Sequence, residues 1–151
     1  LALISDAGTP TISDPGYGLI RECLKREIRI IPIPGVSAIT AAMSASGLPS
    51  DSFTFHGFLP QKKGRLKKIQ DLSHLDNTII LFESPYRLVK TLTQLLESLG
   101  DRSVVVGREL TKLYEEIIRG NLSEVLEYFS KSKVKGEIVI MIGKKDDRIH
   151  F

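Results

Sequence analysis

Short apolar runs that alternate with amphipathic helical segments constrain the fold of this chain more than any other feature. Residues 1–5 and 28–33 form two such runs, and apolar residues recur on one helical face of 17–26 between them. Short buried strands joined by helices are typical of α/β sheets, and a crossover helix makes its two strands parallel. With a small-residue helix over 38–46, residues 1–50 are predicted as strand–loop–helix–strand–loop–helix.

The rest of the chain has a different pattern, typical of a mixed α/β domain. About 90 residues are enough to carry a hydrophobic core of their own. We therefore predict two domains, with 1–50 as the remainder of an N-terminal α/β domain and 51–151 as a complete C-terminal mixed-sheet domain. In the second domain, strands are expected over 53–59, 78–82, 103–106, 114–119 and 137–142. Helices are expected where the basic segment 62–68 leads into a stretch with apolar Leu66, Ile69 and Leu72, over 88–99 and after a cap at Ser123.

Composition and charge limit the classes of protein to which the chain can belong. Hydrophobic residues make up 42% and charged residues 26% of the 151, which suits a packed core rather than a disordered chain. A net charge of +3 is compatible with nucleic acid but does not demand it. The single Cys23 excludes an intramolecular disulfide, and no apolar run is long enough for a membrane span. We expect a cytoplasmic protein without a signal peptide, whose strand-like start without Met indicates a fragment that begins inside a sheet.

Several common sites are absent from the sequence. It contains neither a G-x-G-x-x-G fingerprint nor a G-x-x-x-x-G-K-[ST] phosphate loop. His56, His74 and His150 lie far apart, with no Cys or His at ligand spacing, so no metal site is expected.

Four polar loops remain, each directly after a predicted strand. Any one of them alone is best interpreted as a solvated turn. Ligands in open α/β sheets bind at the carboxyl ends of strands, so the shared position of the four loops predicts one cleft between two domains. The loops cover 5–10, 34–38, 83–87 and 108–112.

The loops are parts of longer stretches that occur in a characteristic order over nearly the whole chain. The stretches are SDAGTP at 5–10, SDPGY at 13–17, PIPGVSA at 32–38, ASGLP at 45–49, GFLP at 57–60, FESPYR at 82–87, RELTK at 108–112 and KGE at 135–137. No single piece is specific, but the ordered set resembles the tetrapyrrole methylase superfamily. Within it, the set is most similar to the bacterial enzymes that methylate the ribose 2′-oxygen of a cytidine in the decoding region of small-subunit ribosomal RNA.

The resemblance implies S-adenosylmethionine as methyl donor, held in a cleft between two α/β domains of a homodimer. It also implies an initial strand and glycine-rich loop that this sequence lacks. Where this chain has SDAGTP, the superfamily more often shows Gly-Asp-Pro. The donor-binding residues implied by the match are Asp6, Ala7, Gly8, Thr9, Pro10, Ser37, Ala38 and Phe82.

Transfer of a methyl group to a ribose hydroxyl benefits from a base or a cation near the oxygen. The candidates for this catalytic role are Glu83, Glu109 and Lys112. For Glu83 the alternative is a salt bridge with Arg87, four residues on, at the start of a helix.

Basic residues are the candidates for contact with the ribosomal RNA. Arg87 and Arg108 suit phosphate groups. The basic segment is either a solvated face or a further RNA contact, through Lys62, Lys63 and Arg65.

Two other functions stay open at this stage. A tetrapyrrole methylase of the same superfamily would act on a small molecule, and a non-catalytic nucleotide- or RNA-binding module would bind without turnover. Whether the fragment is active by itself also stays open.

Overall fold

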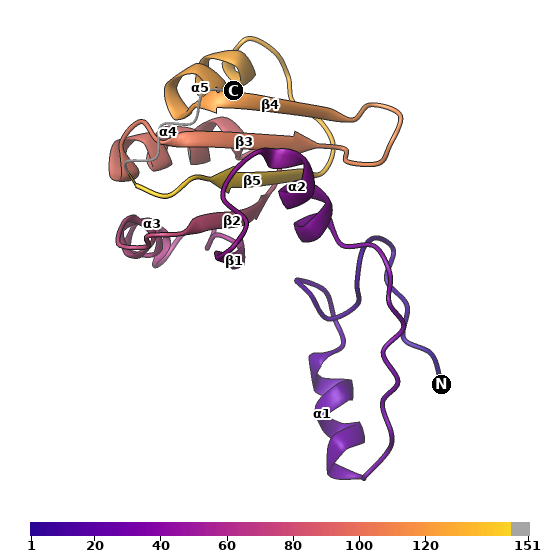
Figure 1. Ribbon diagram of the computed structural model, residues 1–151. Helices are drawn as coiled ribbons and strands as arrows, with labels where there is room; N and C mark the ends of the chain where they lie inside the picture. Colours follow the sequence, from indigo (N-terminus) through magenta and orange to yellow (C-terminus); the bar gives the residue numbers. More distant parts are fainter. Residues whose placement is uncertain (146–151) are drawn as a thin grey trace. The chain divides into compact units, whose positions relative to one another are not determined.

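Within residues 1–145, five strands form one mixed sheet in the order β1-β2-β5-β3-β4 (Figure 1). Strands β1 and β2 are parallel, and the other neighbours are antiparallel. The strands are β1 (Phe53–Phe58), β2 (Thr78–Glu83), β3 (Ser103–Arg108), β4 (Glu116–Asn121) and β5 (Ile138–Ile142). All five were predicted from the sequence, with bounds within two residues.

This computed structural model describes residues 1–145, so His150 lies outside the described residues. Its contacts divide the chain into two units, Leu1–Ala38 and Ile39–Phe151. The domain boundary predicted after residue 50 stays a prediction.

The first unit contains the predicted helix, α1 (Tyr17–Lys25), but neither predicted strand. Residues 1–5 and 28–33 have no strand pairing, and several of their apolar side chains are exposed, such as Ile4 at 85% and Ile33 at 82%. An extended apolar segment becomes a strand only where a neighbour supplies the ladder of backbone hydrogen bonds. Residues 1–38 supply none, so these two strand predictions are wrong for the described structure.

The other helices of the described part of the chain are α2 (Ala38–Ser46), α3 (Arg65–Ser73), α4 (Leu88–Leu99) and α5 (Leu122–Ser130). Helix α4 ends at Gly100, as predicted, because Gly100 adopts φ +76°. Helix α5 begins after Asn121 instead of the predicted Ser123. The Ser123 hydroxyl binds Asp101 at 2.7 Å instead.

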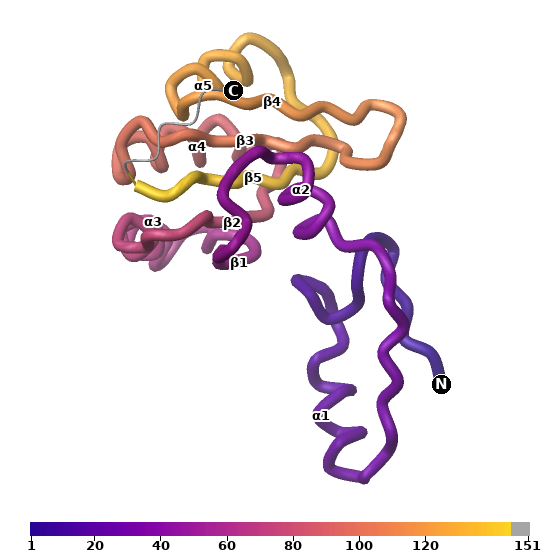
Figure 2. Tube along the Cα trace, viewed as in Figure 1, coloured from indigo at the N-terminus to yellow at the C-terminus, as the bar shows by residue number. Residues whose placement is uncertain are grey.

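The core lies between the sheet and helices α3, α4 and α5. Strand residues of one parity, such as Ile79 and Leu81, pack with helix residues such as Leu92. On strand β4, Arg119 donates from its Nε to the Ser46 carbonyl oxygen of α2 at 3.2 Å. Strand β5 arrives last in the chain and is inserted between β2 and β3, as the trace in Figure 2 shows. This insertion brings residues distant in sequence to the same end of the sheet.

Candidate active site

Four of the characteristic stretches lie at one edge of the sheet in the second unit. At the ends of the parallel pair, Phe58 is in register with Phe82. Glu83 and Arg108, the last residues of β2 and β3, both pair with Ile138, the first residue of β5. We call this edge, formed by 57–60, 82–87, 108–112 and 135–137, the motif edge.

Two predicted catalytic residues, Glu109 and Lys112, are held together with Glu137 on the motif edge. Lys112 Nζ lies 3.0 Å from Glu109 Oε1 and 2.9 Å from Glu137 Oε2. The Glu137 backbone N–H donates to Glu109 Oε1 at 2.8 Å, and the Glu109 N–H donates to the Glu137 carbonyl oxygen at 2.9 Å. We call these three residues the Glu109–Lys112–Glu137 array.

The array sets the charge of both predicted catalytic groups. The hydrogen bond from the Glu137 N–H, followed by that from Lys112, lowers the pKa of Glu109 below its ordinary value. Hydrogen bonds to Glu137 and Glu109 raise the pKa of Lys112 above its ordinary 10.5. A carboxylate with a lowered pKa is a weak base, and an ammonium with a raised pKa is a persistent cation. The array therefore suits stabilisation of negative charge better than proton abstraction.

Gly136 allows the array to form. A Cβ on Gly136 would lie 2.4 Å from Glu109 Cγ, and the residue adopts φ +93°. Glu109 and Thr111 also have positive φ, +51° and +67°, which is uncommon for residues with side chains. The loop thus holds Glu109 against Gly136 at a cost in backbone strain.

Glu83, the third predicted catalytic residue, is a buried structural group. Its side chain has no exposed surface and pairs with Arg87 at 2.7 Å and with Arg65 at 3.5 Å. The same carboxylate accepts hydrogen bonds from the Ser84 N–H at 2.7 Å and from the Thr91 hydroxyl at 2.6 Å. A buried carboxylate with both oxygens engaged does not reach a substrate hydroxyl. The structure therefore bears out the alternative for Glu83, the salt bridge with Arg87, and its burial disfavours a catalytic role, which stays a prediction.

Arg65, predicted to contact RNA, is directed into the interior and is only 5% exposed. Its Nε donates to Gln94 Oε1 at 2.8 Å, and its terminal nitrogens donate to the Pro60 carbonyl oxygen at 3.2 Å and to the Thr91 hydroxyl at 2.6 Å. The guanidinium is thus engaged within the fold, which disfavours the RNA contact at Arg65; that contact stays a prediction.

The other residues of the basic segment differ from Arg65. Lys62 and Lys63 are exposed, and neither forms an ion pair with a described residue. The Arg87 side chain is 24% exposed and bound to Glu83. Contact of Lys62, Lys63 and Arg87 with RNA stays a prediction.

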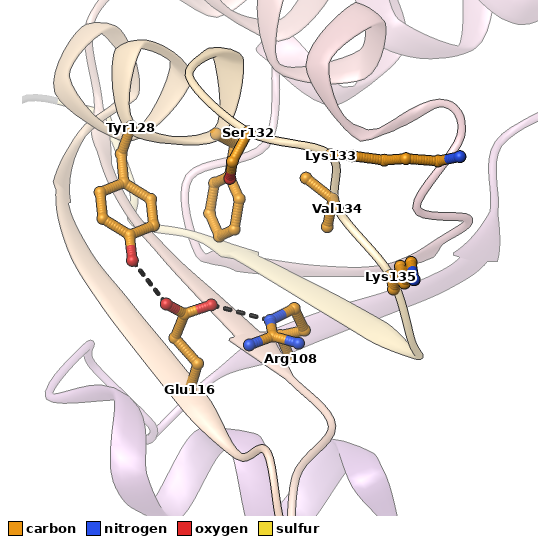
Figure 3. Close-up of a pocket in the computed structure, with 8 residues that line it drawn as sticks. Arg108, Glu116, Tyr128, Ser132, Lys133, Val134 and Lys135 are labelled. Atoms are coloured by element: carbon orange, nitrogen blue, oxygen red, sulfur yellow. Dashed lines mark hydrogen bonds and ion pairs between the residues drawn. The ribbon is translucent and has the colours of Figure 1, made fainter.

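Arg108 lies on a pocket of about 220 Å³ (Figure 3). Arg108 Nε donates to Glu116 Oε2 at 2.7 Å, and the Tyr128 hydroxyl donates to Glu116 Oε1. Burial raises the pKa of Glu116, but the bonds from Tyr128 and Arg108 outweigh burial, so the net pKa is below the ordinary value. The carboxylate therefore stays ionised and orients Arg108.

The predicted donor-binding loops of the first unit are joined by a hydrogen bond. The Thr9 hydroxyl donates to the Val36 carbonyl oxygen at 2.9 Å, which places 5–10 beside 34–38. Gly8 adopts φ +70°, and beyond its two chain neighbours no described residue has an atom within 4 Å of the position that a Cβ would take. The backbone at this turn is therefore open to approach.

The remaining predicted donor contacts lie elsewhere in the chain. Ser37 and Ala38 stand where the first unit ends and α2 begins. Phe82 lies on β2 in the second unit, where its ring centroid is 4.8 Å from that of Phe55 and 5.8 Å from that of Phe58. Donor binding by these residues, and by Asp6, Ala7, Gly8, Thr9 and Pro10, stays a prediction.

The sequence analysis assigned no role to Glu116, Tyr128, Gly136 or Glu137. The KGE stretch carries a signal for Gly136 and Glu137, because it matches the family. The sequence carries no such signal for Glu116 or Tyr128, because acidic residues and tyrosines are common on the surfaces of strands and helices.

Comparison with solved structures identifies the class of protein that this fold defines. The chain resembles uroporphyrin-III C-methyl transferase from Thermus thermophilus complexed with S-adenyl homocysteine, with a TM-score of 0.62 and 19% identity. The match covers 90% of this chain and 62% of that one, and at this identity it shows the fold alone. The sequence profile of the tetrapyrrole (corrin/porphyrin) methylases matches residues 1–126. The chain belongs to this family, and the predicted α/β fold of the tetrapyrrole methylase type is confirmed, with its mixed sheet in the second unit.

Two relatives share closer similarity and the same name, ribosomal RNA small subunit methyltransferase I. The protein from Thermotoga maritima is 45% identical over 97% of this chain and 66% of its own length. The protein from Mesorhizobium japonicum is 50% identical over 95% of this chain and 50% of its own length. The chain thus spans between about half and two thirds of these relatives.

Residues 1–145 contain neither a candidate membrane-spanning helix nor a candidate metal-binding cluster. No helix in this range has the length and apolar character needed to cross a membrane. Within the same range, no three or more His, Cys, Asp or Glu side chains gather in a way that could hold a metal ion.

Proposed function

We propose that this chain is part of an S-adenosylmethionine-dependent methyltransferase that modifies the ribose 2′-hydroxyl of a cytidine in small-subunit ribosomal RNA. The observation that carries the proposal is 45–50% identity, over nearly the whole chain, to relatives named for that class of substrate. A structural neighbour crystallised with S-adenyl homocysteine, the demethylated donor, supports the choice of donor. A homodimer that works on the ribosome in the cytoplasm belongs to the same proposal.

In the first unit, the donor would be held by the predicted loop residues Asp6–Pro10, Ser37 and Ala38. The structure of the first unit fits this role, because Gly8 leaves its backbone open and Thr9 ties the two loops together. The Asp6 carboxylate can accept hydrogen bonds from hydroxyl or ammonium groups. When bound, S-adenosylmethionine supplies an electrophilic methyl group on a sulfonium.

Replacing Gly8 by Val in the intact protein is expected to weaken donor binding at least about tenfold. A β-branched residue is strained at φ +70°, and its side chain would fill the open approach. Calorimetric titration with S-adenosylmethionine measures the effect. Gly64→Val is the matched control, because Gly64 has φ +81° and equally open surroundings but lies outside the predicted donor loops. Equal affinities in the two variants would remove Gly8 from the donor site.

On the side of the methyl acceptor, the array would provide a cation, the Lys112 ammonium group, for the negative charge that develops on the ribose 2′-oxygen. The Lys112 side chain is 45% exposed, so a substrate oxygen can approach its ammonium group. Glu109 and Glu137 hold that group in place, which makes Lys112 the residue that would stabilise the 2′-oxygen as its proton leaves. Alignment of the reacting groups can lower the barrier by a further 7 kcal/mol or so.

Replacing Lys112 by Met is expected to slow methyl transfer about 100-fold and to leave donor affinity unchanged. Lys112→Arg should retain part of the rate, since it keeps the charge. The raised pKa of Lys112 keeps its ammonium group protonated through the neutral range, so its titration should not appear in the neutral part of the pH–rate profile. A rate that increases as Lys112 loses its proton would instead identify it as a base.

The proposed function is tested by mapping ribose methylation of small-subunit RNA in cells that lack the intact protein. We expect one cytidine of the decoding region to lose its 2′-O-methyl group and to regain it when the gene is restored. An unchanged methylation map would contradict the proposal.

Methylation of a tetrapyrrole is the second candidate, favoured by the family description and by the structural neighbour. The 19% identity to that neighbour is far below the 45–50% identity to the relatives named for ribosomal RNA. Incubating the intact protein and labelled donor with small subunits or with uroporphyrinogen III separates the two. Donor and RNA binding without transfer to either would favour the non-catalytic module.

A further inference from the structure

We infer that the pocket beside Arg108 binds a backbone phosphate of the RNA substrate. This inference rests on the proposed function and adds to it a site outside the array. The pocket, which we call the phosphate pocket, is lined by Arg108, Glu116, Tyr128, Phe129, Ser132, Lys133, Val134 and Lys135.

The charges around the phosphate pocket favour an anion. Lys133 and Lys135 are exposed, and neither forms an ion pair with a described residue. In the same loop, Lys131 is paired with Glu127 at 2.8 Å. Against the pocket's three cations stands a single acid, Glu116, whose charge is shared by two donors. An unbalanced group of cations around a concave surface attracts anions.

Arg108 is prepared for this role by its contacts. Its Nε is fixed by Glu116, which is in turn held by Tyr128. The terminal guanidinium nitrogens make no hydrogen bond with another described residue, so the planar fork keeps donors for a phosphate. Figure 3 shows Arg108 and Glu116 on one side of the pocket and the loop with Ser132 and Val134 on the other.

The size and position of the pocket select the ligand class. At about 220 Å³ it holds several water volumes of ~30 Å³ but is smaller than the ~300–1,000 Å³ typical for drug-sized molecules. A phosphate with part of its sugar suits this space, and a tetrapyrrole macrocycle does not. Arg108 directly precedes Glu109, and Lys135 directly precedes Gly136. A nucleotide whose ribose lies at the array would therefore have the phosphate pocket beside it.

The test is the double variant Lys133→Gln with Lys135→Gln in the intact protein. The probe is a fluorescein-labelled single-stranded RNA with the decoding-region sequence, followed by fluorescence anisotropy over a range of salt concentrations. We expect about a tenfold loss of affinity at low salt, and a decrease of roughly 1.4 in the slope of log affinity against log salt. Lys131→Gln removes one positive charge from the same loop outside the pocket and should bind as the unmodified protein does.

The outcomes separate this inference from the proposed function. Wild-type affinity in the double variant would overturn the phosphate pocket, whether or not RNA is methylated. An equal loss in Lys131→Gln would also overturn it, since the effect would then be one of general charge. If the double variant alone binds RNA weakly while the unmodified protein transfers no methyl group to RNA, the pocket stands and the proposed function fails.

Discussion

Replacing Glu83 by Gln will lower the free energy of unfolding of the chain by about 3–5 kcal/mol. The substitution keeps the shape of the side chain but removes the charge that Arg65 and Arg87 share at 3.5 and 2.7 Å. Arg65 is 5% exposed, so its guanidinium would be left buried without a counter-ion. Urea denaturation followed by circular dichroism measures the change.

The control for Glu83 is Glu127→Gln. Glu127 also pairs with a cation four residues away, Lys131, but both side chains are at least 70% exposed. Solvent-screened pairs of this kind contribute little, so no measurable loss of stability is expected. If Glu83→Gln were as stable as Glu127→Gln but failed to transfer methyl groups, the result would support a catalytic role for Glu83.

Replacing Gly136 by Ala will disrupt the array and lower methyl transfer by the intact protein about 100-fold. The new Cβ would stand 2.4 Å from Glu109 Cγ, so Glu109 would have to move, and Lys112 would lose one of its two carboxylate partners. The φ of +93° adds backbone strain, and we expect stability to fall by about 1–3 kcal/mol. Single-turnover methyl transfer and urea denaturation measure the two effects.

The variant Gly64→Ala separates the effect of backbone strain from the effect of a steric clash. Gly64 has φ +81°, close to that of Gly136, but no atom lies within 4 Å of its Cβ position. This variant should lose only about 1–2 kcal/mol of stability, from the left-handed backbone, and keep its activity. Similar activity in the two variants would show that the approach of Glu109 to Gly136 is not needed for methyl transfer.

The elements of the second unit could be predicted because their signals are local. Apolar spacing is enough to place α4, and Gly100 marks its end since glycine adopts φ +76° without strain. The same local signal failed at 1–5 and 28–33, where the apolar pattern of a strand is present but no neighbour completes the ladder. A strand depends on a partner elsewhere in the chain, and a helix does not.

The candidate site also combines residues that are close in sequence with residues that only the strand pairing brings together. Glu109 and Lys112, both catalytic candidates from the sequence, are three residues apart in one loop and form an ion pair. Their partner Glu137 is 28 residues from Glu109, and only the pairing of β3 with β5 brings the two together.

Glu83 shows why residue type and spacing were insufficient. Side chains alternate along a strand, so Glu83 shares a face with Ile79 and Leu81, which pack into the helix-covered core. Arg65 of α3 meets Glu83 there. Local chemistry and periodicity therefore determined the strands and helices of the second unit and the candidate polar groups. The packing of helices on one face of the sheet decided which carboxylates are buried and which remain available to a substrate, because burial depends on residues far away in sequence.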